Sequence, residues 1–297
     1  MYTQFLGNYL LNKGYVTSEQ LVEALQYQKT VHLKLGVLAI HAGYMTASQV
    51  EQIHIMQTHK NGRFGELAVE AGFLTPEQVD FLLSSQKPDY LLLSQALVDK
   101  GYMTTAQFEQ AMQEYKAAYQ ITDMDFANEQ NDKVMQLIQN FYKLDNDKDS
   151  ELFTQYITLL FNNIIRFIGK DFTPHEAVKL SVYPTDQCIT QKINGEFTTD
   201  TAVDMNEDSF IAFASRYAGE EFTDNDEYVQ ASVEDFINLN NGLYVVNLSN
   251  ECSIELSLEP PISKNNMKLD ENTEYFQLPV TFPFGTVNFI IAKTNAG

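Results

Sequence analysis

An acid and an amide stand three residues apart, at Asp235 and Asn238, in a stretch whose apolar residues recur at helical spacing. A helix turns by about 100° per residue, so both side chains fall on the side opposite the apolar face. The small residues Ala231 and Gly242 lie on the same side. This combination predicts a polar notch that another protein could approach closely. The alternative interpretation is a solvated helix face without a specific role.

The helix that carries this pair is expected to start after Thr223 and to run to about Val246. Its core face consists of apolar residues in one sector: Val229, Val233, Phe236, Ile237, Leu243 and Tyr244. Two helices precede it, over residues 152–168 and 209–218, and each ends at a glycine. Strand-like segments are residues 187–193, 196–203, 252–258, 275–282 and 286–292. Residues 149–297 therefore predict an α+β domain with a largely antiparallel sheet and one long helix that bears the motif.

A second pattern repeats four times over residues 1–118, starting at Phe5, Lys34, Arg63 and Leu92 with a constant step of 29 residues. In each copy a glycine stands where a first short helix must end in a left-handed residue. Three residues later comes a threonine, followed three positions on by a glutamine. The glycines are Gly14, Gly43, Gly72 and Gly101, and the threonine–glutamine pairs are Thr17–Gln20, Thr46–Gln49, Thr75–Gln78 and Thr104–Gln107. The T-x-x-Q spacing is that of a helix capping box, so each copy predicts a helical hairpin and the region is expected to be all-α.

The second helix of each predicted hairpin has apolar residues at helical spacing, which we expect to be buried against neighbouring copies. Examples are Leu21, Ala24 and Leu25 in the first copy, and Val79, Leu82 and Leu83 in the third. Residues 119–148 are polar and acidic, with one short amphipathic segment, and are interpreted as a connector. The chain thus predicts an α+β protein with an all-α repeat domain, an acidic connector and an α+β domain.

Charge is unevenly distributed along the chain. Residues 1–120 hold 8 Lys/Arg and 11 Asp/Glu, a net charge of −3, which leaves −18 of the total of −21 for residues 121–297. Such a field disfavours nucleic acid and membrane surfaces as partners and suits basic patches on proteins. No apolar run approaches the roughly 20 residues that cross a bilayer, and no basic signal-peptide region is evident, so we expect a cytoplasmic protein without membrane insertion. The two cysteines and five histidines lack metal-ligand spacing, so no metal site is expected.

The four copies resemble the MshEN family, the N-terminal domain of type II secretion and pilus ATPases, some members of which bind cyclic di-GMP. The resemblance rests on a 24-residue motif of the form RLGxxL with a closing glutamine. The copies here are residues 5–28, 34–57, 63–86 and 92–115. The resemblance implies that the leading arginine and the closing glutamine contact the dinucleotide. A guanidinium can stack on guanine, and N–H groups at a helix start can bind phosphate.

Two adjacent copies keep the ligand-contacting pattern. The matching positions are Arg63, Gly65 and Gln86, together with Lys34, Gly36 and Gln57, where lysine replaces arginine. Phe5 and Leu92 depart from the pattern. The resemblance implies that copies two and three form the nucleotide site, with cyclic di-GMP as the ligand. The alternative is that the glycines and leucines serve packing and that the domain binds protein.

Residues 213–261, FASRYAGEEFTDNDEYVQASVEDFINLNNGLYVVNLSNECSIELSLEPP, resemble the CheC/CheX chemotaxis phosphatase family, and CheX in particular. The common features are GEE, an acidic helix start, an E-x-x-N pair with a glycine four residues after the Asn, and a following strand. Aligning Asn238 and Gly242 places Asp235 at the family's glutamate, one methylene shorter. The resemblance implies that Asn238 orients a water for in-line attack on the phosphoryl-aspartate of a response regulator and that Asp235 holds the regulator's lysine.

Two functions from different classes follow. The first is a bacterial signalling protein whose CheX-like domain binds and dephosphorylates a phosphorylated CheY-like response regulator, regulated by an N-terminal domain that binds cyclic di-GMP. Such an aspartyl-phosphate phosphatase needs no cofactor of its own, because the regulator supplies its magnesium ion. The second is a non-catalytic adaptor with degenerate phosphatase and nucleotide sites. Relatives of the CheX type dimerise, so a homodimer is a further expectation from the resemblance.

Overall fold

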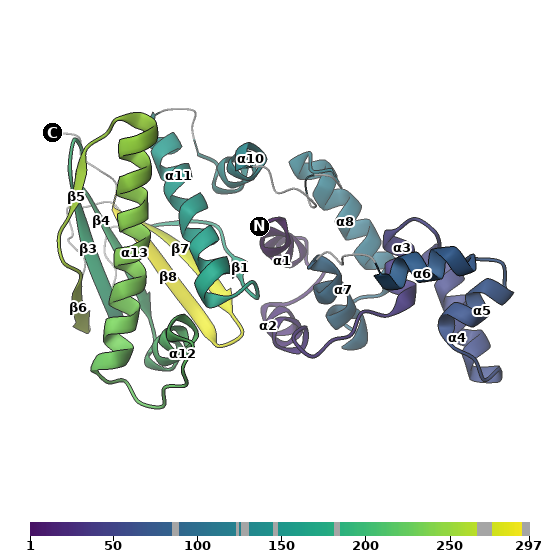
Figure 1. Cartoon of the computed structure of the whole chain (residues 1–297). Helices are drawn as coiled ribbons and strands as arrows, with labels where there is room; N and C mark the ends of the chain where they lie inside the picture. The colour runs from purple at the N-terminus through teal and green to yellow at the C-terminus, as the bar shows by residue number, and fades with distance from the viewer. Residues whose placement is uncertain are drawn as a thin grey trace. The chain divides into compact units, whose positions relative to one another are not determined.

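The computed structural model describes residues 1–84, 89–122, 125, 131–144, 148–180, 185–265 and 275–292. It divides into two compact units (Figure 1). The repeat unit comprises Tyr9–Asn128, and the sheet unit comprises Met1–Asn8 together with Glu129–Gly297. The units differ from the boundaries expected from the sequence, because residues 1–8 and most of the expected connector belong to the sheet unit.

Helices of the first 119 residues form four successive hairpins. The pairs are α1 (Tyr2–Asn12) with α2 (Ser18–Tyr27), α3 (Leu35–His41) with α4 (Ala47–His59), α5 (Phe64–Glu70) with α6 (Pro76–Ser84), and α7 (Tyr90–Asp99) with α8 (Thr105–Tyr119). Each pair turns at a glycine with a positive φ: 71° at Gly14, 70° at Gly43, 75° at Gly72 and 73° at Gly101. The predicted left-handed glycines are confirmed, and they explain why the first helix of each hairpin stops where it does.

The predicted capping boxes are also present. In the first hairpin the N–H of Gln20 donates to Thr17 Oγ1 at 3.3 Å, and the N–H of Thr17 donates to Gln20 Oε1 at 2.9 Å. The same reciprocal pair of bonds caps the N-terminus of the second helix in the other three hairpins. A lost N-cap of this kind costs about 0.5–2 kcal/mol, so the four boxes together define where the second helices begin.

Burial of the second helices follows the expectation in the first hairpin and departs from it in the third. Leu21, Ala24 and Leu25 are buried in α2. In α6 only Leu82 is buried, whereas the Leu83 side chain is 61% exposed, so its predicted burial is wrong. An apolar stripe shows which side chains can be buried, but burial also needs a neighbouring element, and the described residues supply none on that side of α6.

An antiparallel sheet forms the centre of the sheet unit. Its strands are β1 (Thr173–Pro174), β2 (Val178–Leu180), β3 (Gln187–Gly195), β4 (Thr199–Met205), β5 (Leu256–Leu258), β6 (Ile262–Asn265), β7 (Tyr275–Phe282) and β8 (Gly285–Ala292). The order is β1-β7-β8-β4-β3-β5, with β2 also paired to β7 and β6 to β3. Every described pairing is antiparallel, as predicted. The short strands β1, β2 and β6 have no clear alternation and were not expected.

Helices cover one face of this sheet. They are α11 (Lys148–Asn163), continued by a π-helix (Ile164–Ile168), α12 (Glu207–Ala218) and α13 (Glu227–Cys252), and they lie in front of the strands in Figure 1. Two glycines with positive φ, Gly169 at 140° and Gly219 at 70°, end the π-helix and α12 as expected. The segment interpreted as a connector contains a helix, α10 (Asn131–Tyr142), whose apolar side is buried. No helix in the described parts of the chain has both the length and the apolar character that crossing a membrane requires.

Two strand predictions around α13 and β4 need correction. The expected strand over residues 252–258 is wrong at its start, because Cys252 is the last residue of α13 and Ser253 follows it with φ at 56°. Strand β5 is confined to Leu256–Leu258. The strand expected from residue 196 begins at Thr199, after a turn. Local β-propensity did not reveal that the long helix continues to Cys252.

The buried side of α13 rotates along its length. Buried residues advance in steps of four, and each such step turns the stripe by about 40° around the helix. They are Val229, Val233, Phe236, Ile237, Asn240, Asn241, Tyr244 and Leu248. Leu243 lies outside this rotating buried stripe and is 38% exposed, so its predicted place in the core is wrong. A long helix that crosses a twisted sheet follows such an inclined row instead of a fixed sector.

Candidate functional site

The outward side of α13 carries the acid and amide pair. Asp235 and Asn238 are both exposed, as is Ala231, and Gly242 is half-buried. The helix is held at its start by Asp226, whose carboxylate accepts hydrogen bonds from the N–H groups of Tyr228 and Val229 at 3.0 Å each. Phe236 and its apolar neighbours anchor the opposite side against the sheet and α12. The two polar groups therefore project from a rigid support.

Asp235 is held by a neighbour on α12. The hydroxyl of Tyr217 donates to Asp235 Oδ2 at 2.6 Å, and the Tyr217 ring packs edge-on against Phe236 at 5.7 Å. Burial, followed by the hydrogen bond and the charge of Asp235, raises the pKa of the Tyr217 hydroxyl. The tyrosine therefore stays a neutral donor. Among the described residues the other carboxylate oxygen, Oδ1, has no hydrogen bond, and it is the one available to a partner.

Asn238 is held from beneath by the sheet. The side-chain nitrogen of Gln191, on β3, donates to Asn238 Oδ1 at 2.7 Å. The two positions are separated by 47 residues in the chain. Sequence reasoning missed both Gln191 and Tyr217. A signal for Gln191 exists, because it stands between Ile189 and Ile193 at an inward position of an alternating strand, where an apolar residue is expected.

Gly242 leaves space on the outward side of α13. A Cβ placed there would meet only Leu258 Cδ1, at 4.0 Å. Glycine in a helix interior is less stable than alanine by about 0.5–1 kcal/mol, and here no internal contact demands it. The packing of this chain therefore does not explain the glycine. Its effect is that no side chain projects from the helix surface at this point beside Asn238.

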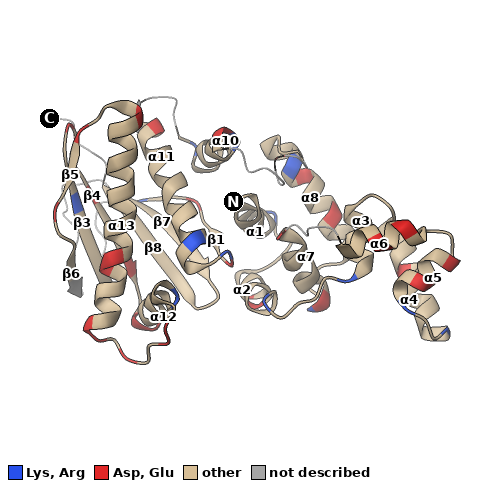
Figure 2. Cartoon of the chain, in the orientation of Figure 1, with Lys and Arg blue, Asp and Glu red and all other residues tan. Residues whose placement is uncertain are grey.

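The surface around the pair is acidic. Figure 2 shows acidic residues on α13 and on the loop that precedes it. From Gly219 to Cys252 the chain contains no lysine or arginine. The acidic residues of this segment are Glu220, Glu221, Asp224, Asp226, Glu227, Glu234, Asp235 and Glu251. A partner that brings a lysine or a basic patch would meet no like charge here. In the described residues no three His, Cys, Asp or Glu side chains are grouped as metal ligands.

No protein-family model matches the chain, and no curated protein matches it. Similar solved structures include chemotaxis proteins. CheX from Desulfovibrio desulfuricans is 15% identical with a TM-score of 0.42, over 48% of this chain and 99% of that chain. CheX from Vibrio vulnificus is 14% identical with a TM-score of 0.42, over 48% and 98%. The CheX–CheY–BeF3–Mg²⁺ complex from Borrelia burgdorferi matches at 14% identity with a TM-score of 0.41, over 48% and 97%.

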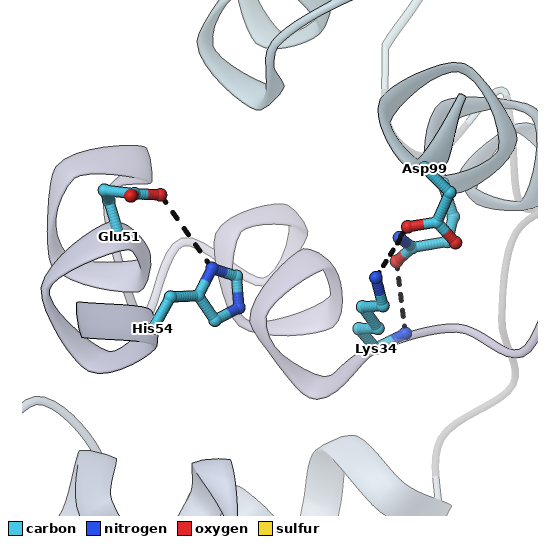
Figure 3. Close-up of polar contacts among 5 residues, drawn as sticks. Lys34, Glu51, His54 and Asp99 are labelled. Carbon is cyan, nitrogen blue, oxygen red and sulfur yellow. Dashed lines mark hydrogen bonds and ion pairs between the residues drawn. The ribbon is translucent and has the colours of Figure 1, made fainter. Parts of the chain in front are cut away.

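In the repeat unit, Lys34 is bound to a residue of the fourth hairpin. Its Nζ lies 2.6 Å from Asp99 Oδ1, and its backbone N–H donates to Gln95 Oε1 at 3.3 Å (Figure 3). Gln95 Nε2 also donates to Asp99 Oδ1, at 2.8 Å. The Lys34 side chain is 58% exposed, so the ion pair contributes little to stability. A ligand would nevertheless have to compete with Asp99 for it.

The two glycines of the candidate nucleotide site are explained by packing. A Cβ at Gly36 would lie 2.8 Å from Val50 Cγ1 and 3.2 Å from Phe64 Cζ. A Cβ at Gly65 would lie 3.0 Å from Leu35 Cδ2 and 3.2 Å from a methyl group of Val79. The starts of α3 and α5 therefore lie in contact. A side chain at Gly36 would also clash with Val50 of α4, and one at Gly65 would need Leu35 and Val79 to shift slightly, so packing favours glycine at both positions.

The remaining candidates lie at the surface. The Arg63 side chain is exposed, while its backbone N–H donates to Glu66 Oε2 at 3.0 Å. Gln57 Nε2 donates to the carbonyl of Gly62 at 3.3 Å, in the segment between the second and third copies. Gln86 lies outside the described residues. His54 packs its ring on Phe64, with centroids 5.5 Å apart, and its Nδ1 is 3.9 Å from Glu51 (Figure 3). Of the six candidates, Arg63 is the charged group that no described residue engages.

Proposed function

We propose that the sheet unit binds the phosphorylated receiver domain of a CheY-like response regulator and hydrolyses its aspartyl phosphate. The observation that carries the proposal is the pair Asp235 and Asn238, exposed on successive turns of α13 and each held in place by a side chain behind it. Preorganised polar groups on a rigid surface are what a positioning catalyst needs. The resemblance to the CheX motif supplies the substrate class.

The proposed reaction needs little from the protein beyond positioning. Asn238 orients a water in line with the phosphorus, the water oxygen forms a bond to phosphorus, and the bond from phosphorus to the regulator's aspartate oxygen breaks. The aspartate leaves as a carboxylate, and the inorganic phosphate that is released carries the oxygen and both protons of the water. The regulator's own magnesium ion would neutralise the phosphoryl charge. Asp235 would receive the regulator's lysine through its unengaged Oδ1, which aligns the phosphoryl group with Asn238.

The shortened acid sets a condition on this docking. Asp235 is one methylene shorter than the glutamate of the resembling family, and a misplacement of about 1 Å can cost about 100-fold in rate. A closer approach of the partner compensates for it, and Gly242 and Ala231 provide the low surface that such an approach requires. In a pure adaptor the same surface would dock the receiver domain without turnover.

Phosphate release from a phosphorylated receiver domain tests the proposal. The native chain should accelerate release, and Asn238→Ala should lose the acceleration by about 100-fold while it still binds the receiver domain. Asn247→Ala on the same helix, at an exposed position away from the pair, is the matched control and should behave as the native chain. Equal rates for the native chain and Asn238→Ala, with binding retained, would leave the adaptor function.

A second proposal concerns the repeat unit, and the exposed Arg63 at the start of α5 favours it. We propose that Arg63 stacks on a guanine of cyclic di-GMP, with N–H groups of the α5 start near a phosphate. Lys34 would join only by leaving Asp99. Calorimetry of the full chain with cyclic di-GMP, compared with Arg63→Ala, is the test. If high micromolar cyclic di-GMP produces no heat of binding, the proposed nucleotide site is wrong, and protein binding is left as the role of this unit.

A further inference from the structure

The side chain of Gln191 links the outward Asn238 to the interior of the sheet unit. Gln191 is 2% exposed and lies on the face of β3 that packs under α13. Its Nε2 has two hydrogen-bond acceptors, the backbone carbonyl of Glu259 at 2.9 Å and Asn238 Oδ1 at 2.7 Å. An amide nitrogen carries two hydrogens, so both of them are used.

The orientation of both amides follows from the chemistry of these partners. A backbone carbonyl can only accept, so the atom of Gln191 that faces Glu259 must be the nitrogen. The same nitrogen faces Asn238, and it can only donate. The atom of Asn238 on that side must therefore be Oδ1, which turns Nδ2 toward the outside.

A second set of bonds holds the other end of Gln191. Its Oε1 accepts from Asn241 Nδ2 at 2.9 Å, and that nitrogen also donates to Thr201 Oγ1 at 2.8 Å. The Thr201 hydroxyl donates to the backbone carbonyl of Gln191 at 3.0 Å, and Asn241 Oδ1 accepts from the hydroxyl of Tyr156 at 2.9 Å. Every member has one consistent donor or acceptor role, so the network has a single arrangement and Gln191 cannot turn over.

We infer that Gln191 is a positioning residue that fixes which edge of the Asn238 carboxamide faces the phosphoryl group. The inference rests on the proposed function. With Gln191 in place, the outward edge offers the two N–H donors of Nδ2 and the second lone pair of Oδ1. Together these can hold an attacking water or a phosphoryl oxygen in one orientation. Without Gln191 the carboxamide rotates, and its donors and acceptor exchange places.

Gln191→Met in the full chain tests the inference, because methionine keeps the length and approximate volume and removes all three side-chain hydrogen bonds, to Asn238, Glu259 and Asn241. Thr199→Val is the matched control. The Thr199 hydroxyl is buried in the same sheet and donates to the carbonyl of Ala292 at 2.8 Å, with no bond to the network. Both variants should melt at a lower temperature. Only Gln191→Met should lower kcat for phosphate release, by about 10- to 100-fold, with KM for the phosphorylated receiver domain little changed.

A spectroscopic readout separates this inference from the proposed function. The side-chain ¹H–¹⁵N resonances of Asn238, identified by their loss in Asn238→Ala, should shift in Gln191→Met and stay in place in Thr199→Val. Unshifted resonances in Gln191→Met, or an unchanged kcat, would overturn the inference. If the native chain releases no phosphate, the proposed function fails, and the resonances alone decide the role of Gln191.

A second variant, Gln191→Glu, tests the inference if Gln191→Met does not fold. Gln191→Glu has the same shape but presents acceptors, so Asn238 would have to turn Nδ2 inward. Its resonances should then shift and its kcat should fall as well. Native resonances together with native kcat in Gln191→Glu would show that Gln191 does not set the orientation.

Discussion

Replacing Gly242 by alanine should make the protein more stable and should weaken its binding of the receiver domain. The added Cβ would meet only Leu258 Cδ1 at 4.0 Å, which is an ordinary van der Waals contact, so the substitution has no steric cost inside the chain. Alanine in a helix interior is favoured by about 0.5–1 kcal/mol over glycine. For a unit of this size that gain raises Tm by roughly 1–4 °C.

The same methyl group should weaken docking of the receiver domain. If a partner packs closely over Gly242, a methyl at that point forces the surfaces apart, and overpacking of a fitted contact costs about 1–3 kcal/mol. That range corresponds to an increase in Kd of about 5- to 150-fold. Gain of stability and loss of binding would then come from one methyl group, a combination that general damage to the fold cannot produce.

Thermal unfolding and calorimetry with a receiver domain activated by beryllium fluoride measure both effects. Asn247→Ala serves as the control, because it also raises helix propensity on α13 but lies away from Asp235 and Asn238. It should raise Tm slightly and leave Kd unchanged. A Gly242→Ala variant that binds as tightly as the native chain would refute the placement of the interface over Gly242. A lowered Tm would refute the statement that a Cβ at position 242 has free space around it.

Two further predictions concern titrating groups of the sheet unit. Burial, and then the charge of Asp204, raises the pKa of the Cys188 thiol to about 12, whereas Cys252 is exposed. The native chain should therefore react rapidly with one equivalent of a thiol reagent, the urea-unfolded chain with two, and native Cys252→Ser with none. Burial also lowers the pKa of His175, whose Nε2 lies 2.8 Å from Thr281 Oγ1. The unfolded chain binds a proton below about pH 6.5 that the folded chain resists, so stability should fall as pH drops through that value, and His175→Gln should flatten this part of the urea-midpoint profile.

The hairpins of the repeat unit could be predicted because their signals are local. Gly43 needs no distant partner to adopt a positive φ, and the bonds between Thr46 and Gln49 span three residues. The same holds for strand β7, whose alternation and the turn that follows it at Pro283 and Phe284 place it at Tyr275–Phe282 as expected. Wherever a few neighbouring residues decide the backbone, sequence pattern and structure agree.

The misplaced residues depend on elements that are far away in the chain. Leu243 is exposed because the buried stripe of α13 follows the twist of a sheet that no periodicity of the helix itself records. Gln191 reaches Asn238 only because β3 passes beneath α13. The motif could be read from residues 231–242, but the side chains that hold it come from another strand and another helix. Tyr217 is the second example of such a support.

The sheet unit is assembled from two separated stretches of chain. Gln4 Nε2 donates to the carbonyl of Lys170 at 2.7 Å, and the ring of Phe5 packs on Phe141 and Phe161 with centroids 4.7 and 5.8 Å apart. During synthesis, residues 1–8 leave the ribosome before their partners have been made. They can form these contacts only after the whole repeat unit has been synthesised. Closing so long a loop has an entropic cost that grows only slowly with its length. A fragment that starts at residue 149 would lack both Phe5 and Phe141, and Phe161 would keep only its contact with Phe172, at 5.8 Å between centroids, among these rings. Shortened versions of the protein therefore need to retain the first helix.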